Sequence, residues 1–323
     1  MSKIPTLDLD AAPNAETAAL IRHLAREEGR LADWLTLDAP AGRALAEETN
    51  RRWNVDLPPL ALVRHLKIQA NDELGTPTLA ARLFAPANAH GVLLYVHGGG
   101  WAFCSLATHE RAMRLLALAS GMAVVGVAYR LAPEHPFPVP LLDTVAAWRA
   151  LSDGQIVGGG PYAIGGDSAG ANLALAAMLH EQREGRVLPR LALLYYGVYA
   201  NDHSTPSHRA YGRGFGLTTQ GMERYWAWYI PDASNRANPL ASPLLAEDAA
   251  LAGLPPLWLN AAGLDPLASD SLLLAARLRD LGRDDPIVLH AGVLHGFMQQ
   301  ATVVTEGRQA FQMSGDWARE ILA

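Results

Sequence analysis

The sequence predicts an α/β fold in which a mostly parallel central sheet is flanked by helices on both faces. Three observations carry this prediction. Strand-like and helix-like segments alternate along most of the chain. Several runs, among them 91–96 and 122–128, are almost wholly apolar, which is typical of strands buried on both faces. Half of the 323 residues are hydrophobic, which is ample for a large core.

Two polar-rich amphipathic helices are expected before the first strand, over residues 15–29 and 31–49. Their apolar positions near helical spacing are Leu20, Ile21, Leu24, Leu31, Trp34 and Leu35. Because these helices precede the sheet, they form either a cap over it or a packing appendage outside it. We therefore divide the chain into an N-terminal helical cap segment, residues 1–60, and a main α/β domain, residues 61–323.

The rest of the chain follows the α/β alternation, apart from two segments. An antiparallel pair is expected at 63–69 and 78–84, and later strands at 91–96, 122–128, from 162, 191–196, 257–262 and 287–290. Helices are expected at 108–120, 140–152, 169–184, 269–281 and 303–322. The proline-broken segment 129–138 cannot be regular. Residues of about 199–245 carry prolines and many aromatics, and they predict an insertion of short helices over the sheet.

Composition excludes several classes of protein. The net charge is −6 and no basic run occurs, which argues against a nucleic-acid partner. The single cysteine, Cys104, rules out an intrachain disulfide and any multi-cysteine metal site. The N-terminus lacks the apolar core of a signal peptide, and no apolar run reaches the ~20 residues of a membrane-spanning helix. We therefore expect a cytoplasmic protein that does not contact membranes.

The stretch from Tyr162 to Asn172 joins a short apolar run to an alanine-rich helical run through Gly166-Asp-Ser-Ala-Gly170. This pattern predicts a strand, a sharp turn and a helix, with Ser168 at the apex as a nucleophile. Gly166 and Gly170 leave space where side chains next to so tight a turn would collide. The alternative is an ordinary glycine-rich turn, and the other groups that a nucleophilic serine needs decide between the two.

The base for such a serine should be a histidine, and in folds with this turn the chain order is serine, acid, histidine. Of eleven histidines, only His290 and His295 follow the strand at 257–262. We expect His290 at a strand end among apolar residues, where a structural role fits better. His295 lies in a loop with Gly296, just before the last helix. His295 is therefore the predicted base.

The acid should leave a strand end between Ser168 and His295. Asp265 follows the 257–262 strand directly, and Pro266 stiffens its loop. The rival, Asp270, falls at a predicted helix start, where capping is a sufficient role. Asp265 is therefore the predicted acid.

Donors for an oxyanion are expected in His97-Gly98-Gly99-Gly100, which follows a buried strand. Glycines let the backbone turn and approach a ligand closely. The N–H of Ala169, the residue after the nucleophile, would supply the second donor. A flexible loop is the alternative, whereas a P-loop is excluded because no Gly-Lys-Ser/Thr follows. The other glycine run, 158–160, has no strand before it and predicts a turn.

Five motifs, in the right order over about residues 60–320, resemble those of the bacterial hormone-sensitive-lipase-like carboxylesterases, which are α/β-hydrolases. They are His97-Gly-Gly-Gly-Trp101, Tyr129-Arg-Leu-Ala-Pro-Glu134, Gly166-Asp-Ser-Ala-Gly170, Asp265-Pro-Leu267 and His295-Gly-Phe297. The resemblance implies Ser168 as nucleophile, Asp265 as acid, His295 as base, and Gly98, Gly99 and Ala169 as oxyanion donors. It also implies a cap built from the N-terminal helices and the 199–245 insertion, and frequent homodimers.

Two positions depart from the family pattern. Ala171 replaces a second glycine after the turn, and no loss is expected because alanine is small and favours helices. The family often follows Asp-Pro-Leu with Arg-Asp-Glu, whereas this chain has Ala268-Ser269-Asp270. Any salt bridge or substrate contact that the family makes there is therefore not carried over.

The sequence thus predicts a serine carboxylesterase that needs no cofactor and no metal and acts on small-molecule esters with short acyl chains. Candidate substrate contacts are Trp101, Tyr211, Phe215 and Trp226. Two alternatives share the scaffold: a silent small-molecule binder and an amide hydrolase. The presence of His295 favours an enzyme, because related receptor proteins have lost this histidine. The natural acyl and alcohol groups do not follow from the sequence.

Overall fold

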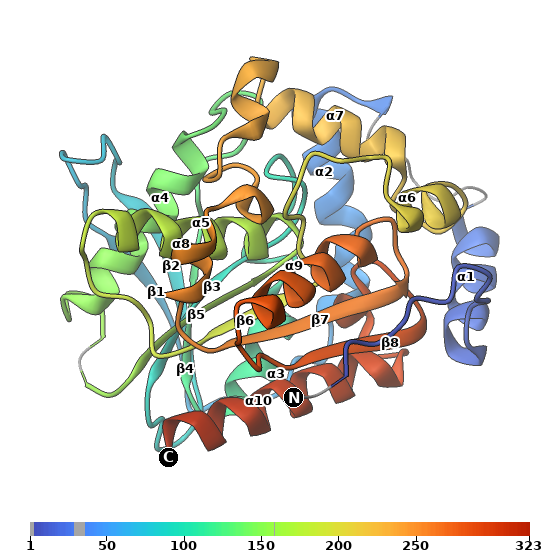
Figure 1. Cartoon of the computed structure of the whole chain (residues 1–323). Helices are drawn as coiled ribbons and strands as arrows, with labels where there is room; N and C mark the ends of the chain where they lie inside the picture. The colour runs from blue at the N-terminus through green and yellow to red at the C-terminus, as the bar shows by residue number, and fades with distance from the viewer. Residues whose placement is uncertain (1–2, 29–35, 158) are drawn as a thin grey trace.

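The computed structural model describes residues 3–28, 36–157 and 159–323. Over these residues the chain forms an eight-stranded sheet in the order β1-β2-β4-β3-β5-β6-β7-β8 (Figure 1). The strands are β1 (Leu62–Ile68), β2 (Leu79–Ala85), β3 (Val92–Val96), β4 (Ala123–Val127), β5 (Tyr162–Asp167), β6 (Ala192–Tyr195), β7 (Leu257–Leu264) and β8 (Ile287–Leu294). Strand β2 pairs antiparallel with β1 and β4, and the other neighbours are parallel. The predicted fold class and the antiparallel opening pair are confirmed.

Helices connect and cover these strands. The α-helices are α1 (Ala15–Glu28), α2 (Ala39–Asn50), α3 (Glu110–Ser120), α4 (Val139–Ser152), α5 (Ala169–Arg183), α6 (Pro206–Tyr211), α7 (Thr219–Tyr229), α8 (Asp248–Ala252), α9 (Ala268–Asp280) and α10 (Thr305–Leu322). The 3₁₀ helices are η2 (Arg51–Asn54), η3 (Ala233–Ala237), η4 (Pro243–Leu245) and η5 (Phe297–Gln300). The segment between β4 and α4 is irregular, as its prolines predict.

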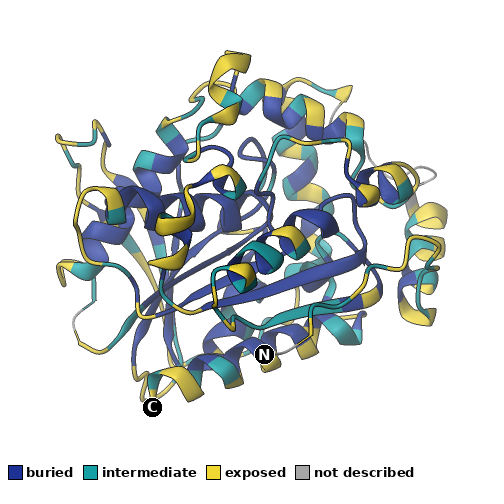
Figure 2. Ribbon diagram, viewed as in Figure 1, coloured by how far each residue is buried: buried dark blue, intermediate teal, exposed yellow. Residues whose placement is uncertain are grey.

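The sheet separates two hydrophobic cores. Helices α4, α5 and α9 pack on one face, and α3 and α10 pack on the other (Figure 1). Strand β3 illustrates the alternation, because Leu94 and Val96 join the first core while Leu93 and Tyr95 join the second. Figure 2 shows the central strands buried throughout, as the apolar runs predict.

The N-terminal helices differ from their predicted bounds. Helix α2 begins at Ala39 because the Asp38 carboxylate accepts the Ala41 N–H at 2.9 Å and Pro40 suits the first turn. Residues Gly29, Leu31, Trp34 and Leu35 of the predicted helices lie outside the described residues.

The segment 199–245 forms short helices, as predicted, namely α6, α7, η3 and η4. Helix α7 lies beside the segment that leads into α2, since Arg224 donates from Nη2 to the Leu37 carbonyl oxygen at 2.7 Å. We call residues 36–54 and 199–245 together the covering layer, of which α7 lies along the top of the view in Figure 1.

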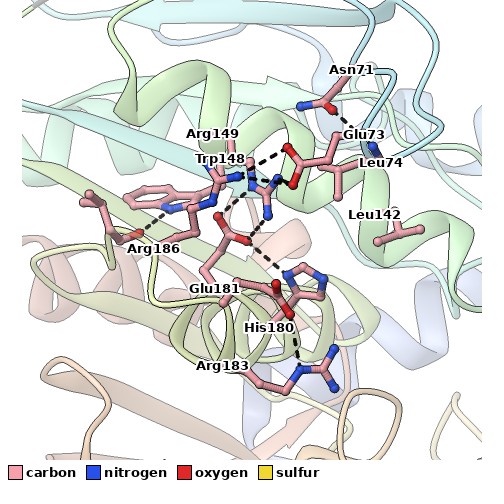
Figure 3. A network of polar contacts seen from close by, with 12 residues as sticks. Asn71, Glu73, Leu74, Leu142, Trp148, Arg149, His180, Glu181, Arg183 and Arg186 are labelled. Carbon is pink, nitrogen blue, oxygen red and sulfur yellow. Dashed lines mark hydrogen bonds and ion pairs between the residues drawn. The ribbon is translucent and has the colours of Figure 1, made fainter.

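A polar network fixes α5, the helix that begins just after Ser168, against α4. Arg149 of α4 donates from Nε and Nη2 to the two carboxylate oxygens of Glu181 on α5, at 2.9 and 2.8 Å (Figure 3). Glu73, from the loop between β1 and β2, lies 3.2 Å from Arg149 Nη1. Because Arg149 and Glu181 are both buried, this two-pronged ion pair holds the two helices in one register.

Candidate active site

Three polar side chains meet where parallel strands end. Ser168 follows β5, Asp265 follows β7 and His295 follows β8. The carboxyl ends of these strands lie along one edge of the sheet, which is where open α/β sheets place their sites. His295 Nε2 lies 3.0 Å from Ser168 Oγ, and His295 Nδ1 lies 2.7 Å from Asp265 Oδ2. The structure therefore brings together the predicted nucleophile, base and acid.

Ser168 occupies a strained turn with φ 54° and ψ −121°. A side chain at Gly166 would collide with the Val96 carbonyl oxygen and the Gly170 backbone, and one at Gly170 would collide with the same carbonyl. The steric reason predicted for both glycines is confirmed. Strain of this kind, about 1–3 kcal/mol per residue, persists only where the surrounding structure enforces it.

The two neighbours of Ser168 are themselves held in place. Asp265 is fully buried, and its Oδ1 accepts the Leu267 N–H at 2.8 Å. The His295 ring is edge-on to Tyr196, with the ring centroids 5.0 Å apart. A buried carboxylate on one ring nitrogen and a hydroxyl on the other form an arrangement that can take a proton from serine and return it.

The rival histidine lies elsewhere. His290 is within β8 and not at a strand end, so its predicted position is wrong, although its predicted structural role agrees with its contacts. Its ring packs at 4.9 Å from Phe297, and burial lowers its pKa to about 4.

The rival acid has a role that the sequence did not indicate. Asp270 lies in the first turn of α9, but instead of capping that helix it accepts the N–H groups of Tyr199 and Ala200, at 2.7 and 3.1 Å. The capping prediction is therefore wrong. Burial raises the pKa of Asp270 to about 7, and the carboxylate of Asp265 acts in the same direction.

The glycine loop after β3 requires a correction to one predicted oxyanion donor. The Gly98 N–H donates to Asp167 Oδ1 at 3.0 Å, so it is already engaged. Within residues 3–28, 36–157 and 159–323, the N–H groups of Gly99, Gly100 and Ala169 donate no hydrogen bond. Gly99 and Gly100 have φ of +114° and +59°, which explains why glycine is needed there.

The predicted substrate contacts fall into two groups. Trp101 is fully buried, stacks on Tyr229 of α7 at 4.2 Å and lies 4.9 Å from Trp226. Tyr211 and Phe215 form a separate cluster with Leu264 and Leu294, the residues just before the predicted acid and base.

Two residues of this region went unnoticed in the sequence. Asp167 is the variable position of the Gly-x-Ser turn. Its place at the end of a buried strand is the sequence feature that could have indicated a buried carboxylate beside Ser168. Tyr196 follows β6 with φ +36°, and only the fold places it against His295.

The comparisons with known proteins agree with this geometry. Residues 93–299 match a protein family described as alpha/beta hydrolase fold. An ethyl acetate hydrolase of Pseudomonas putida is 34% identical over 246 residues, which are 73% of this chain and 76% of that protein. An acetyl esterase of Salmonella schwarzengrund is 32% identical over 289 residues, 84% of this chain and 83% of that protein. A solved thermostable esterase of Pseudomonas putida has a TM-score of 0.88 and 28% identity, covering 100% and 99% of the two chains.

The chain therefore belongs to the α/β-hydrolase family. Within that family it is a carboxylesterase, an enzyme that hydrolyses esters. No helix among the described residues is long and apolar enough to cross a membrane.

Proposed function

We propose that this enzyme hydrolyses short-chain acyl esters through a triad of Ser168, His295 and Asp265. The observation that carries the proposal is the continuous chain of contacts from Asp265 through both nitrogens of His295 to Ser168 Oγ, at 2.7 and 3.0 Å. His295 takes the serine proton as Oγ attacks the ester carbonyl, and it returns the proton to the leaving alcohol. Water then attacks the acyl-serine with His295 again as base, and the acid is released.

The oxyanion that forms in each step needs donors beside Ser168. We assign this role to the N–H groups of Gly99, Gly100 and Ala169, because they lack acceptors within the described part of the chain. Gly98 is replaced in this assignment, since its N–H donates to Asp167.

Two features support short acyl chains. The relatives described above are named for ethyl acetate and acetyl esters. In addition, the side chains next to the glycine loop are large and closely packed, among them Trp101, Trp226 and Tyr229. Together with the five motifs, these features support membership of the hormone-sensitive-lipase-like branch.

Other properties also remain proposals. The covering layer is suited to a cap, because α7 packs directly on the glycine loop. The division of the chain at residue 60, a homodimer and a cytoplasmic location stay predictions from the sequence and the family resemblance.

Replacement of the nucleophile tests the proposal. Ser168→Ala should lower kcat on p-nitrophenyl acetate by about 10⁴-fold or more, because the remaining groups cannot form an acyl-enzyme. A phosphonate should add one mass increment to the unaltered enzyme, on Ser168, and none to the variant. Ser120→Ala, which removes another buried serine hydroxyl on α3, is the matched control and should keep full activity. Near-normal turnover by Ser168→Ala would refute the mechanism.

A further inference from the structure

A second buried carboxylate adjoins the proposed triad. Asp167 is the last residue of β5, immediately before Ser168, and is only 4% exposed. A carboxylate removed from water needs hydrogen bonds or an opposite charge in compensation. One of its partners is the buried ring of His109, whose Nε2 lies 3.3 Å from Asp167 Oδ2.

The other carboxylate oxygen binds two groups from outside β5. Asp167 Oδ1 accepts the Tyr95 hydroxyl of β3 at 2.7 Å and the Gly98 N–H at 3.0 Å. The buried side chain of Asp167 thus joins the nucleophile turn, β3 and the glycine loop. Nothing in the proposed acyl transfer uses this carboxylate, so its place at the junction requires another explanation.

The buried His109 ring lies between two polar groups. Its Nδ1 lies 2.8 Å from the Thr108 hydroxyl, which donates to the Ser105 carbonyl oxygen at 2.9 Å, and its Nε2 lies 3.3 Å from Asp167 Oδ2. The His109 ring therefore links the Asp167 carboxylate to the start of the segment that leads into α3.

The glycine loop is fixed at two peptide groups, one on either side of the Gly98–Gly99 peptide. Its Gly98 N–H is held by Asp167, and its Gly99 carbonyl oxygen accepts the N–H groups of Ala102 and Phe103, at 3.1 and 2.9 Å. A side chain at Gly98 would come within 2.6 Å of Asp167 Oδ2, so the backbone rests directly on the carboxylate. With these two anchors in place, the Gly99 and Gly100 N–H groups are left without acceptors within the described residues.

We propose that Asp167 is a positioning residue that sets the distance between Ser168 Oγ and the oxyanion donors of Gly99 and Gly100. Its side chain binds the glycine loop and its backbone continues into Ser168. One residue therefore connects the serine to the loop that carries the proposed oxyanion donors. Oxyanion donors act over about 2.7–3.1 Å, so a small displacement of the loop removes their benefit. A negative charge beside a developing oxyanion is unfavourable, so the role is geometric, and an amide of the same shape should fill it.

Three variants separate geometry from charge. Asp167→Asn keeps an oxygen for Gly98 and Tyr95 and places its amide nitrogen beside His109 Nε2. Asp167→Ala removes the anchor, and Asp167→Ser keeps a polar group that is too short to reach Gly98. Glu181→Gln alters a buried acid in the α4–α5 network and is the matched control (Figure 3). Rates are measured per phosphonate-titrated active site, together with the affinity of a trifluoromethyl ketone that adds to Ser168 as an oxyanion.

We expect Asp167→Ala and Asp167→Ser to lower kcat by about 10²-fold or more, as the loss of an oxyanion donor does. Ketone affinity should fall by a similar factor, while KM stays within about threefold. Asp167→Asn should stay within about tenfold of the unaltered enzyme, and Glu181→Gln should keep its rate per site.

Two results would overturn the inference. One is an unchanged rate per site, or an unchanged ketone affinity, in Asp167→Ala and Asp167→Ser, which would make Asp167 merely structural. The other is an Asp167→Asn variant as impaired as Asp167→Ala, which would assign the effect to charge. The inference rests on the proposed triad, but the two can fail separately. Failure of the triad would appear in the unaltered enzyme as the absence of a phosphonate-reactive Ser168.

Discussion

The strand ends that carry Ser168, Asp265 and His295 differ from the covering layer in what holds them. Each strand end is fixed by the backbone hydrogen bonds of β5, β7 and β8, and all three strands lie between the two cores. The covering layer is attached mainly by side chains. Arg43 of α2 donates to the carbonyl oxygens of Ala102 and Ala132, both at 2.8 Å, and pairs with the half-exposed Glu134.

The two regions meet at the glycine loop. The Tyr225 ring of α7 occupies the space that a side chain on Gly100 would need, and Trp226 and Tyr229 of the same helix pack on Trp101. This difference indicates a division of roles. Under the proposed mechanism, the reaction depends on backbone positions that tolerate little change, and we expect substrate choice to depend on side chains of the covering layer, which can be exchanged without disturbing the sheet.

The largest effect should come from the strand ends. His295→Ala and Asp265→Asn should each lower kcat/KM by about 10³–10⁴-fold, because the proton relay is lost or held in the wrong tautomer. The neighbours give matched controls. His290→Ala and Asp270→Asn should change kcat/KM by less than about tenfold, since neither contacts Ser168 or His295 in any hydrogen bond of the described chain. If His290→Ala were inactive and His295→Ala remained active, the assignment of His295 as the base would be wrong.

A smaller loss should follow at the junction of the two regions. Gly100→Ala should lower kcat by about 10²-fold, because a methyl group at φ +59° both strains the loop and collides with Tyr225, displacing an oxyanion donor. Gly216→Ala is the control, since its φ is +84° but its Cβ would meet open space in the covering layer. Equal losses in the two variants would show that strain alone matters.

Changes within the covering layer should alter selectivity more than rate. Along p-nitrophenyl acetate, butyrate, octanoate and palmitate, kcat/KM should peak at about two to six carbons. Each buried methylene gains ~0.8 kcal/mol until overpacking costs about 1–3 kcal/mol. Trp226→Leu should move the peak to longer chains, by about tenfold in the octanoate-to-acetate ratio.

The control for this experiment lies outside the covering layer. Trp258→Phe alters a tryptophan in the core beneath α10 and should leave the chain-length profile unchanged. A maximum at palmitate in the unaltered enzyme would contradict the short-chain proposal.

The smallest effect concerns the pH dependence of stability where the sheet meets the covering layer. The pKa of Asp270 is about 7 in the folded protein, against ~3.9 for an exposed aspartate. Between these values the folded protein holds a proton that the unfolded chain has lost, so this group's contribution to stability falls as pH rises through the window. Because asparagine does not titrate, Asp270→Asn should lack this contribution to the pH dependence of stability.

Thermal unfolding at several pH values tests this expectation. From pH 5 to 8, the Tm of the unaltered protein should fall further than that of Asp270→Asn, with each kcal/mol equal to about 2–4 °C. Parallel Tm curves would show that Asp270 is not protonated near neutral pH.

The meeting of Ser168, Asp265 and His295 at one edge of the sheet was largely predictable from the sequence, because each residue follows a buried strand with a clear local pattern. The errors arose where contacts between residues far apart in the sequence determine the end of an element or the partner of a polar group. Strand β8 was expected to end at His290. Instead, a bulge against β7 accommodates Gly292 at φ +69°, and its carbonyl oxygen accepts the Asn14 N–H at 2.9 Å.

Two hydrogen-bonding contacts could likewise not be predicted from the sequence. Asp270 satisfies a preference for helix starts, yet its partners lie about seventy residues earlier in the chain, at Tyr199 and Ala200. The Gly98 N–H donates to Asp167, sixty-nine residues later, and the glycine run and the family resemblance could not indicate this contact. Local patterns predict which residues can act, but only the fold shows which of their hydrogen-bonding groups are free.

The strained backbone of Ser168 places activity and stability in conflict. Glycine adopts a conformation of φ 54° and ψ −121° without steric strain, whereas serine is held there by the strands and glycines around it. We therefore expect Ser168→Gly to stabilise the protein, and, if Ser168 is the nucleophile as proposed, selection for heat resistance alone would favour a molecule that can no longer cleave an ester. Under the proposed mechanism, the enzyme keeps the hydroxyl of Ser168 in a backbone conformation that a purely structural protein would not retain.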